Sequence, residues 1–334
     1  MLELTYDGSF GHHLTLNEDQ NPASPALCQS LSQPSDVAPG SPTCGPGGSE
    51  GTYTRANGEV VHTTRVGALG SNFQGMGLEA NVGNSAYNAL FATLGYTANR
   101  LNFKVRYILS KGMDNGSGRG DQEFYGGNPN FFRCISDYDS RHNFTANYTY
   151  ELPFDKVLHF NERITRGWKI SGVTQFEQGI PVIVYEYNDD NSEVGDKGVT
   201  PWYQSTDEPV YTPGNIVGDH NPRHAVQQGT AYAYFNTSLF QPEAPGQQGN
   251  SPRRFFHSPG IDDTDVALIK AVKITEHTSA EFRAQFFNSL NHAQFSQGIG
   301  NGIDGNIDDG VGGFGTYSGG SDPRSGQFAV KFTF

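Results

Sequence analysis

Residues 141–152 read RHNFTANYTYEL, and they decide the fold because two kinds of side chain alternate along them. Mostly apolar or aromatic residues stand at every second position, and Arg, Asn, Thr and Glu fill the positions between. Successive side chains of a β-strand point to opposite faces, whereas a helix would spread this pattern around all its sides. The segment therefore predicts a strand with one apolar face, which carries Phe144 and Tyr148, and one polar face.

Seven further segments show the same alternation. In 280–286, Phe282 and Phe286 alternate with charged and amide side chains, and the chain ends on an alternating series that closes with Phe334. The predicted strands are 2–14, 86–98, 101–110, 141–152, 168–186, 263–274, 280–286 and 327–334. We therefore expect an all-β, antiparallel fold.

The composition favours strands and loops over helices. Only 35% of the 334 residues are hydrophobic, while 42 are Gly, 18 Pro, 23 Phe and 16 Tyr. The mean hydropathy is −0.54, and no segment approaches the run of about 20 apolar residues that a membrane helix needs. A helical membrane protein is excluded. A membrane β-barrel is not, because each of its strands turns only alternate residues toward lipid.

The connections between the predicted strands alternate strictly in length. The long connections are 15–85, 112–138, 187–262 and 291–325, and the short ones are 99–100, 153–167 and 275–278. Outer-membrane barrels have long extracellular loops and short periplasmic turns. A periplasmic C-terminus would place every long connection, rich in Gly, Asn, Asp and Pro, outside the cell as a solvated segment that need not bury a core. The sequence thus predicts a transmembrane β-barrel in the outer membrane.

This arrangement assigns a role to each face of the predicted strands. Charges are costly on the lipid side of a barrel, so the alternating charged residues should face the interior. The predicted interior set is Lys104, Arg106, Arg141, Glu281, Arg283 and Lys331. The predicted lipid-facing and assembly set is Phe144, Tyr148, Phe282, Phe286, Phe328, Val330, Phe332 and Phe334.

Enzymes and nucleic-acid-binding proteins are poor fits to the sequence. The net charge of −13 and the absence of a basic patch argue against a nucleic-acid partner. The sequence contains no GxSxG, HExxH, P-loop or helix-opening GxGxxG motif, so we expect no catalytic residues and no cofactor. We predict no metal site, because loop His and Asp residues are usually solvated. The candidate ligands are His12 with His13, His220 with His224, and the acidic residues of Asp189–Asp196 and Asp304–Asp309. Arg119-Gly120-Asp121 spells an adhesion tripeptide, which three residues in a Gly-rich loop form easily by chance.

Two of the three cysteines, Cys28 and Cys44, share one Pro/Gly/Ser-rich stretch without paired CxxC spacing. A loop disulfide, and therefore an oxidising compartment, is the natural interpretation. Two free thiols remain the alternative. Cys134 has no evident partner in the sequence.

Short motifs along nearly the whole chain resemble those of Oar-like TonB-dependent receptors. Asn84–Leu90, followed by Tyr107, Ser110-Lys111 and Asp114, resembles the family's "S-x-YNAL … YT-x-SK-x-x-D" strand pair. Further matches, in the family's order, are Tyr138–His142, Tyr150–Phe154, Gly167-Trp168, Gly172–Thr174, Gly179–Pro181, Tyr234–Thr237, Pro259-Gly260, Asp265–Lys270, Phe282–Asn288, Asn291-His292 and the terminal Phe. Each motif is weak alone, and their ordered succession is specific.

The resemblance implies that residues 1–334 form the C-terminal part of a larger barrel, about eight strands of 22. Family members carry a signal peptide, a carboxypeptidase-regulatory-like domain and a plug ahead of the barrel, and none of these is visible in the sequence. The implied partners are outer-membrane lipid, the barrel assembly machinery, the TonB system through the missing N-terminal part, and an unidentified extracellular substrate. Two alternatives stay open: an outer-membrane surface-binding or adhesion protein, and a secreted soluble β-rich binding protein or enzyme.

Overall fold

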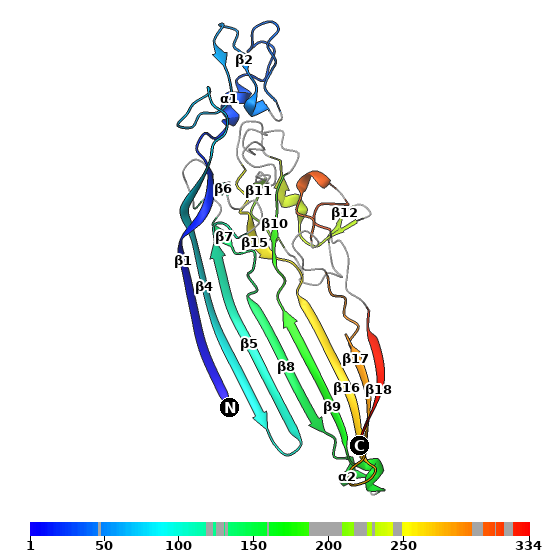
Figure 1. Ribbon diagram of the computed structural model, residues 1–334. Helices are drawn as coiled ribbons and strands as arrows, with labels where there is room; N and C mark the ends of the chain where they lie inside the picture. Colours follow the sequence, from blue (N-terminus) through cyan, green and yellow to red (C-terminus); the bar gives the residue numbers. More distant parts are fainter. Residues whose placement is uncertain are drawn as a thin grey trace.

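A computed structural model places eight long strands side by side in one antiparallel sheet (Figure 1). The structure describes residues 1–45, 48–117, 123–124, 130, 133–158, 160–186, 209–216, 226–228, 231–242, 249–295, 303–310, 312–316 and 323–334. The strands are β1 (Leu2–Asp19), β4 (Gly77–Thr97), β5 (Leu101–Asp114), β8 (His142–Glu151), β9 (Trp168–Glu177), β16 (Ile261–Lys273), β17 (Ser279–Phe287) and β18 (Ser325–Thr333). Among the described residues, no helix has the length and apolar content needed to cross a membrane.

Each long strand pairs with the strand that precedes or follows it among these eight, so the sheet is an up-and-down meander. The order is β18-β17-β16-β9-β8-β5-β4-β1. Two short strands extend it: β6 (Glu123–Phe124) pairs with β1 in parallel, and β7 (Cys134–Ile135) pairs with β5. The prediction of an all-β antiparallel fold is confirmed.

The connections lie where the predicted alternation in length puts them. The turns β4–β5 and β16–β17 are short, and the β8–β9 connection holds two four-residue helices, α2 (Phe154–Val157) and α3 (Glu162–Thr165). These three connections lie at one end of the sheet, and the four long connections lie at the other (Figure 1). The first long connection is shorter than the predicted 15–85, because β1 continues to Asp19 and β4 already starts at Gly77.

The long connections bury hydrophobic clusters of their own, so the expectation that they are solvated segments without a core is wrong. One cluster, here called the aromatic cap, consists of Val182, Val184, Tyr234, Phe235, Phe240, Phe256 and Phe314. Phe235 lies at its centre, with ring centroids 5.0 Å from Phe256 and 5.3 Å from Phe314 in edge-to-face geometry. The cap joins residues from the β9–β16 and β17–β18 connections into one packed body.

Short elements surround the cap above the loop end of the sheet (Figure 1). They are β10 (Pro181–Ile183), β11 (Val210–Tyr211), β12 (Val226–Gln228), β13 (Ala231–Ala233), η3 (Thr237–Leu239), β14 (Phe240–Gln241), β15 (Arg254–His257) and η4 (Ile307–Asp309). They pair as three small antiparallel ribbons, β10 with β15, β11 with β14 and β12 with β13.

The predicted single strand 168–186 is divided in the structure into β9 and β10. The chain leaves the main sheet at Gly179 and returns to it through Gly260, next to Ser258 and Glu177 respectively. A Cβ atom at Gly179 would collide with the Ser258 carbonyl, and one at Gly260 would collide with the Glu177 carbonyl. These two glycines allow the two backbones to approach closely where the cap leaves the sheet.

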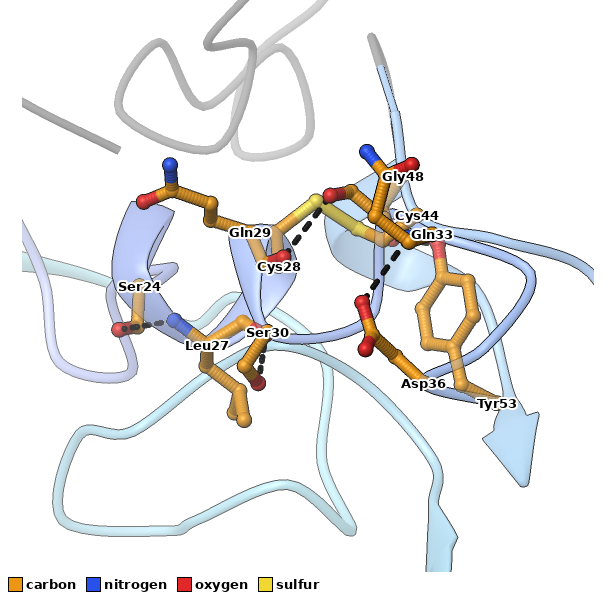
Figure 2. The surroundings of a disulfide bond; sticks show 11 residues. Ser24, Leu27, Cys28, Gln29, Ser30, Gln33, Asp36, Cys44, Gly48 and Tyr53 are labelled. Atoms are coloured by element: carbon orange, nitrogen blue, oxygen red, sulfur yellow. Dashed lines mark hydrogen bonds between the residues drawn. A yellow bond between two sulfur atoms is a disulfide. The ribbon is translucent and has the colours of Figure 1, made fainter. Parts of the chain in front are cut away.

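The first long connection forms a separate tip that contains α1 (Pro25–Gln29), η1 (Gly48–Glu50), β2 (Tyr53–Thr54) and β3 (Val60–Val61). Cys28 and Cys44, which are 16 residues apart in the sequence, are joined by a disulfide (Figure 2). Both pack in the second cluster with Leu31, Val37, Tyr53 and Val61. Ser24 caps α1 by accepting from the Leu27 amide, and the Tyr53 hydroxyl donates to the Gly48 carbonyl. Cys134 is buried and is not part of a disulfide.

Candidate functional site

The strand register gives the sheet one apolar and one polar face. Residues that pair directly across antiparallel strands share a face, and Tyr107, Phe144 and Phe176 pair in one row across β5, β8 and β9. The next row of the same kind holds Val105, Ala146 and Thr174. Between these two rows, Arg106, Thr145 and Gln175 point to the opposite face. The two-faced pattern read from the sequence thus extends across the sheet.

Every predicted lipid-facing residue inside a strand lies on the apolar face. Phe282 pairs with Val330, and the neighbouring rows pair Phe286, Phe328 and Phe332 with small residues of the adjoining strand. Phe286 and Phe328 contact each other edge to face with centroids 6.4 Å apart. Phe328 is 82% exposed, because β18 is the last strand at its side of the sheet, and Phe334 follows the end of β18 and is 93% exposed.

The charged residues predicted to face the interior lie on the polar face, with one exception. Glu281 pairs with Lys331 across β17 and β18. Lys104, Arg106 and Arg283 occupy alternate positions of the same polar phase in β5 and β17. Arg141 lies one residue before β8 and therefore has no place in this register. Arg106 also lies 5.2 Å from the ring centre of Phe91, an aromatic residue of the polar face.

Lys270 is a residue of the apolar face that the sequence interpretation missed. It pairs with Trp168 and with Phe282, close to the ends of β9 and β17. Its ammonium group donates to the carbonyls of Ile164 and Arg166 and lies 5.2 Å from the Trp168 ring centre. Such an arrangement lets a lysine carry its charge out of an apolar surface toward the end of the strand. Its place on the apolar face could have been predicted from the sequence, because Lys270 stands between Leu268 and Val272 in the alternating apolar series.

An ion pair joins two of the short connections. The Arg100 guanidinium donates to both carboxylate oxygens of Asp155, at 3.0 and 2.9 Å. These hydrogen bonds hold the pKa of Asp155 below its ordinary value and raise that of Arg100. Phe154 packs edge to face on Trp168 beside the pair. The contact fixes the β4–β5 turn against the β8–β9 connection.

At the opposite end, two buried polar contacts attach the cap to the sheet. Arg254 of β15 is 1% exposed, donates to the Ile135 carbonyl at 2.7 Å and lies 3.8 Å from Asp114 at the end of β5. His257, also of β15, lies 2.9 Å from Asp139. Asp139 in turn accepts from a backbone amide of β5. Buried polar groups that are paired in this way hold their elements in one geometry.

A pocket of about 520 Å³ lies between the aromatic cap and the loop end of β9 and β16. Its lining combines aromatic side chains with polar groups from the ends of the two strands and from the cap. The lining residues are Glu177, Gln178, Tyr211, Gly214, Asn215, Ile216, Tyr234, Phe255, Phe256, His257, Ser258, Pro259 and Gly260. Burial in the cap raises the pKa of Tyr234 to about 12. No motif in the sequence pointed to this pocket, because its walls come from distant segments.

The weighed metal candidates do not gather in the described part of the chain, where no group of three or more His, Cys, Asp or Glu residues could hold an ion. His12 contacts Asn84, and His13 contacts the Asn81 carbonyl, at a bulge of β1. In 304–309, side chains accept from neighbouring amides, as in ordinary turns, and burial raises the pKa of Asp304. His220, His224, Asp189–Asp196 and Arg119–Asp121 lie outside the described residues.

An antiparallel meander with one apolar face, one polar face and all long connections at one end has the architecture of a membrane β-barrel wall. The sequence matches the outer membrane beta barrel domain family over residues 1–327, and the chain belongs to that family. It is therefore a protein of the Gram-negative outer membrane. No curated protein and no solved structure matched the chain.

Proposed function

We propose that this chain forms part of the barrel wall of a TonB-dependent, Oar-like uptake receptor. The ordered motifs carry the proposal, and the structure supports it where the first motif pair can be examined. Ser85–Leu90 of β4 pairs directly with Leu109–Asp114 of β5, so the two halves of the motif form one continuous patch of the sheet. Direct pairing of the two halves is what a structural unit of a barrel wall requires.

In this proposal the apolar face contacts outer-membrane lipid, and the polar face lines the interior. The exposed aromatic residues of β17 and β18 support the first assignment, because water would be a poor solvent for so wide an apolar surface. The charged polar face supports the second assignment. Glu177, at the loop end of that polar face, lines the pocket beneath the cap, and in this proposal an extracellular substrate would enter there.

The experiment compares compounds taken from the growth medium by wild-type cells, by cells lacking the gene and by cells lacking TonB. We expect compounds that only the wild type depletes, and both deletions should leave the same ones in the medium. Complementation with the intact gene should restore depletion, and a protonophore should abolish it. Uptake that depends on the gene and continues without TonB would overturn the TonB-dependent assignment.

Surface binding without transport is a second candidate, and the disulfide-bonded tip favours it. The tip is a packed unit with its own buried cluster, held away from the sheet by the extended β1–β4 hairpin (Figure 1). The same cells discriminate the two functions. An adhesion protein would change attachment of the cells to a surface or partner, and deletion of its gene would leave every compound in the medium depleted as before.

A further inference from the structure

The pocket beneath the aromatic cap has walls whose chemistry suits one class of ligand. Tyr211 and Phe255 form one wall, with ring centroids 4.9 Å apart and planes inclined by 52°. Both rings are only partly buried, and Phe240 supports them from the cap at 5.3 and 6.4 Å. The tilted pair therefore presents aromatic surface to the pocket. The negative face of an aromatic ring attracts cations, and paired rings form cages for ammonium groups.

Another part of the lining carries negative charge and hydrogen-bond acceptors. Glu177, the last residue of β9, belongs to the polar face and contributes a carboxylate. Asp263 and Asp265 follow on the same face of the adjoining strand β16. Among the described residues that line the pocket there is no Lys or Arg. A bound anion would therefore meet repulsion, and a bound cation would meet attraction.

Gln178 adds a hydrogen-bonding requirement. The residue lines the pocket, and its side-chain oxygen is buried just behind the surface, with no hydrogen-bond partner among the described residues. A buried acceptor without a donor costs free energy, and a turn of the Gln178 side chain toward the pocket would let a ligand N–H group recover it. Since the ring pair favours a cation and Gln178 favours a donor, both requirements meet in a protonated amine. The volume of about 520 Å³ lies in the range of small-molecule sites.

We propose that this pocket binds an organic ammonium ion that carries at least one N–H group, seated between the Tyr211–Phe255 ring pair and Glu177. The proposal deepens the proposed function, on which it rests only in treating the pocket as a substrate site. The ammonium group donates to Gln178 and Glu177, and the carbon skeleton lies against the rings. The aromatic cap and the strand ends hold these groups at fixed positions before the ligand arrives.

The test measures binding to the intact protein, purified from outer membranes and kept in an amphipathic polymer, by calorimetry and ligand-observed nuclear magnetic resonance. The probes are two matched pairs, benzylamine with benzyl alcohol and putrescine with 1,4-butanediol. Each alcohol replaces the ammonium group by a neutral donor of similar size. We expect at least one amine to bind at least about tenfold more tightly than its alcohol.

Three variants locate the site. Glu177→Gln keeps the shape of the side chain and should weaken amine binding about tenfold, while leaving the weak alcohol binding unchanged. Tyr211→Leu combined with Phe255→Leu should remove the preference for the amine. Glu281→Gln removes a carboxylate of the same polar face at the other end of the sheet and should bind as the wild type does. Retention of the heat-modifiable folded form on gels checks that each variant is assembled.

Equal binding of amine and alcohol, absence of amine binding to folded protein, or amine binding that Glu177→Gln leaves unchanged would overturn the inference. The uptake experiment stays independent of these outcomes. Amine binding with TonB-independent uptake would refute the receptor assignment and leave the pocket assignment intact. TonB-dependent uptake without amine binding would refute the pocket assignment and leave the receptor assignment intact.

Discussion

A positive charge placed on the apolar face should destabilise the barrel according to its depth, and β8 offers the positions to test this. On β5 the apolar phase runs from Leu101 to Leu109, and β8 pairs with this whole span. At about 3.3 Å per residue and a strand tilt of about 40°, the span has a height of roughly 20 Å. Ala146 pairs with Val105 at its middle. Phe144 pairs with Tyr107, roughly 5 Å from its loop end.

Ala146→Arg should lower the free energy of unfolding by about 2–4 kcal/mol, the cost of an arginine on the lipid face at mid-bilayer. This corresponds to a change of about 30- to 900-fold in the unfolding equilibrium. Phe144→Arg should also destabilise, mainly through loss of the aromatic side chain, because its charge reaches the interface. Asn143→Arg, on the polar face opposite Glu177, should change stability by less than about 0.5 kcal/mol.

The assay is reversible denaturant unfolding of the intact protein in lipid vesicles, followed by the gel mobility of the heat-modifiable form. All three variants lie on one strand, so differences in strand propensity and expression are nearly matched. If Asn143→Arg were as destabilising as Ala146→Arg, or if Ala146→Arg were tolerated, the assignment of the apolar face to lipid would fail.

Three further predictions concern other parts of the molecule. Non-reduced protein from outer membranes should show no alkylation of Cys28 or Cys44, and two alkylated thiols would refute the disulfide. Reduction should destabilise the tip by about 3 kcal/mol, the value for a loop of this length. In the intact protein, deletion of residues 326–334 or Phe334→Asp should reduce the amount of heat-modifiable barrel in the outer membrane. Normal, protease-resistant levels would contradict a role of the terminus in assembly. The pKa of Tyr234, raised from 10.0 to about 12, means that the unfolded chain loses this proton before the folded cap does. Cap stability should therefore fall as pH rises from 10 to 12, less so in Tyr234→Phe, and phenolate absorbance that titrates near pH 10 would refute the burial.

The long strands were predictable because each obeys a local rule. In a strand between lipid and the barrel interior, apolar and polar side chains must alternate. Around Phe144, Phe282 and Phe328 this alternation can be recognised within a few residues of sequence. The extensions of β1 to Asp19 and of β4 back to Gly77 were missed for the same reason. The hairpin there has passed beyond the span that needs one apolar face, so its sequence loses the alternation while its backbone still pairs.

No local sequence pattern predicted the cap, the pocket or the contacts that attach them to the sheet. His257 and Asp139 are 118 residues apart, and Arg254 is 119 residues from Ile135, whose carbonyl it contacts. No repeating sequence pattern links residues so far apart, and isolated Asp, His and Arg residues in loops are usually solvated. The signal that was available is compositional. Phe235, Phe240, Phe255 and Phe256 are four phenylalanines in a connection that had been expected to need no core.

The register of β9 in the sheet determines which of its side chains lines the pocket. Glu177 pairs with Asn143 on one side and Ile261 on the other, which fixes it on the polar face at the point where the chain departs for the cap. A slip of one residue in β9 would move its carboxylate to the apolar face and bring Phe176 inside. Gly179 and Gly260 allow the backbone segments that leave and re-enter the sheet to lie in close contact. The pairing of β9 with its neighbouring strands therefore also positions the cap. The local alternation that makes β9 a membrane strand thus also determines which side chain faces the pocket, although the residues that complete the site lie in the loops.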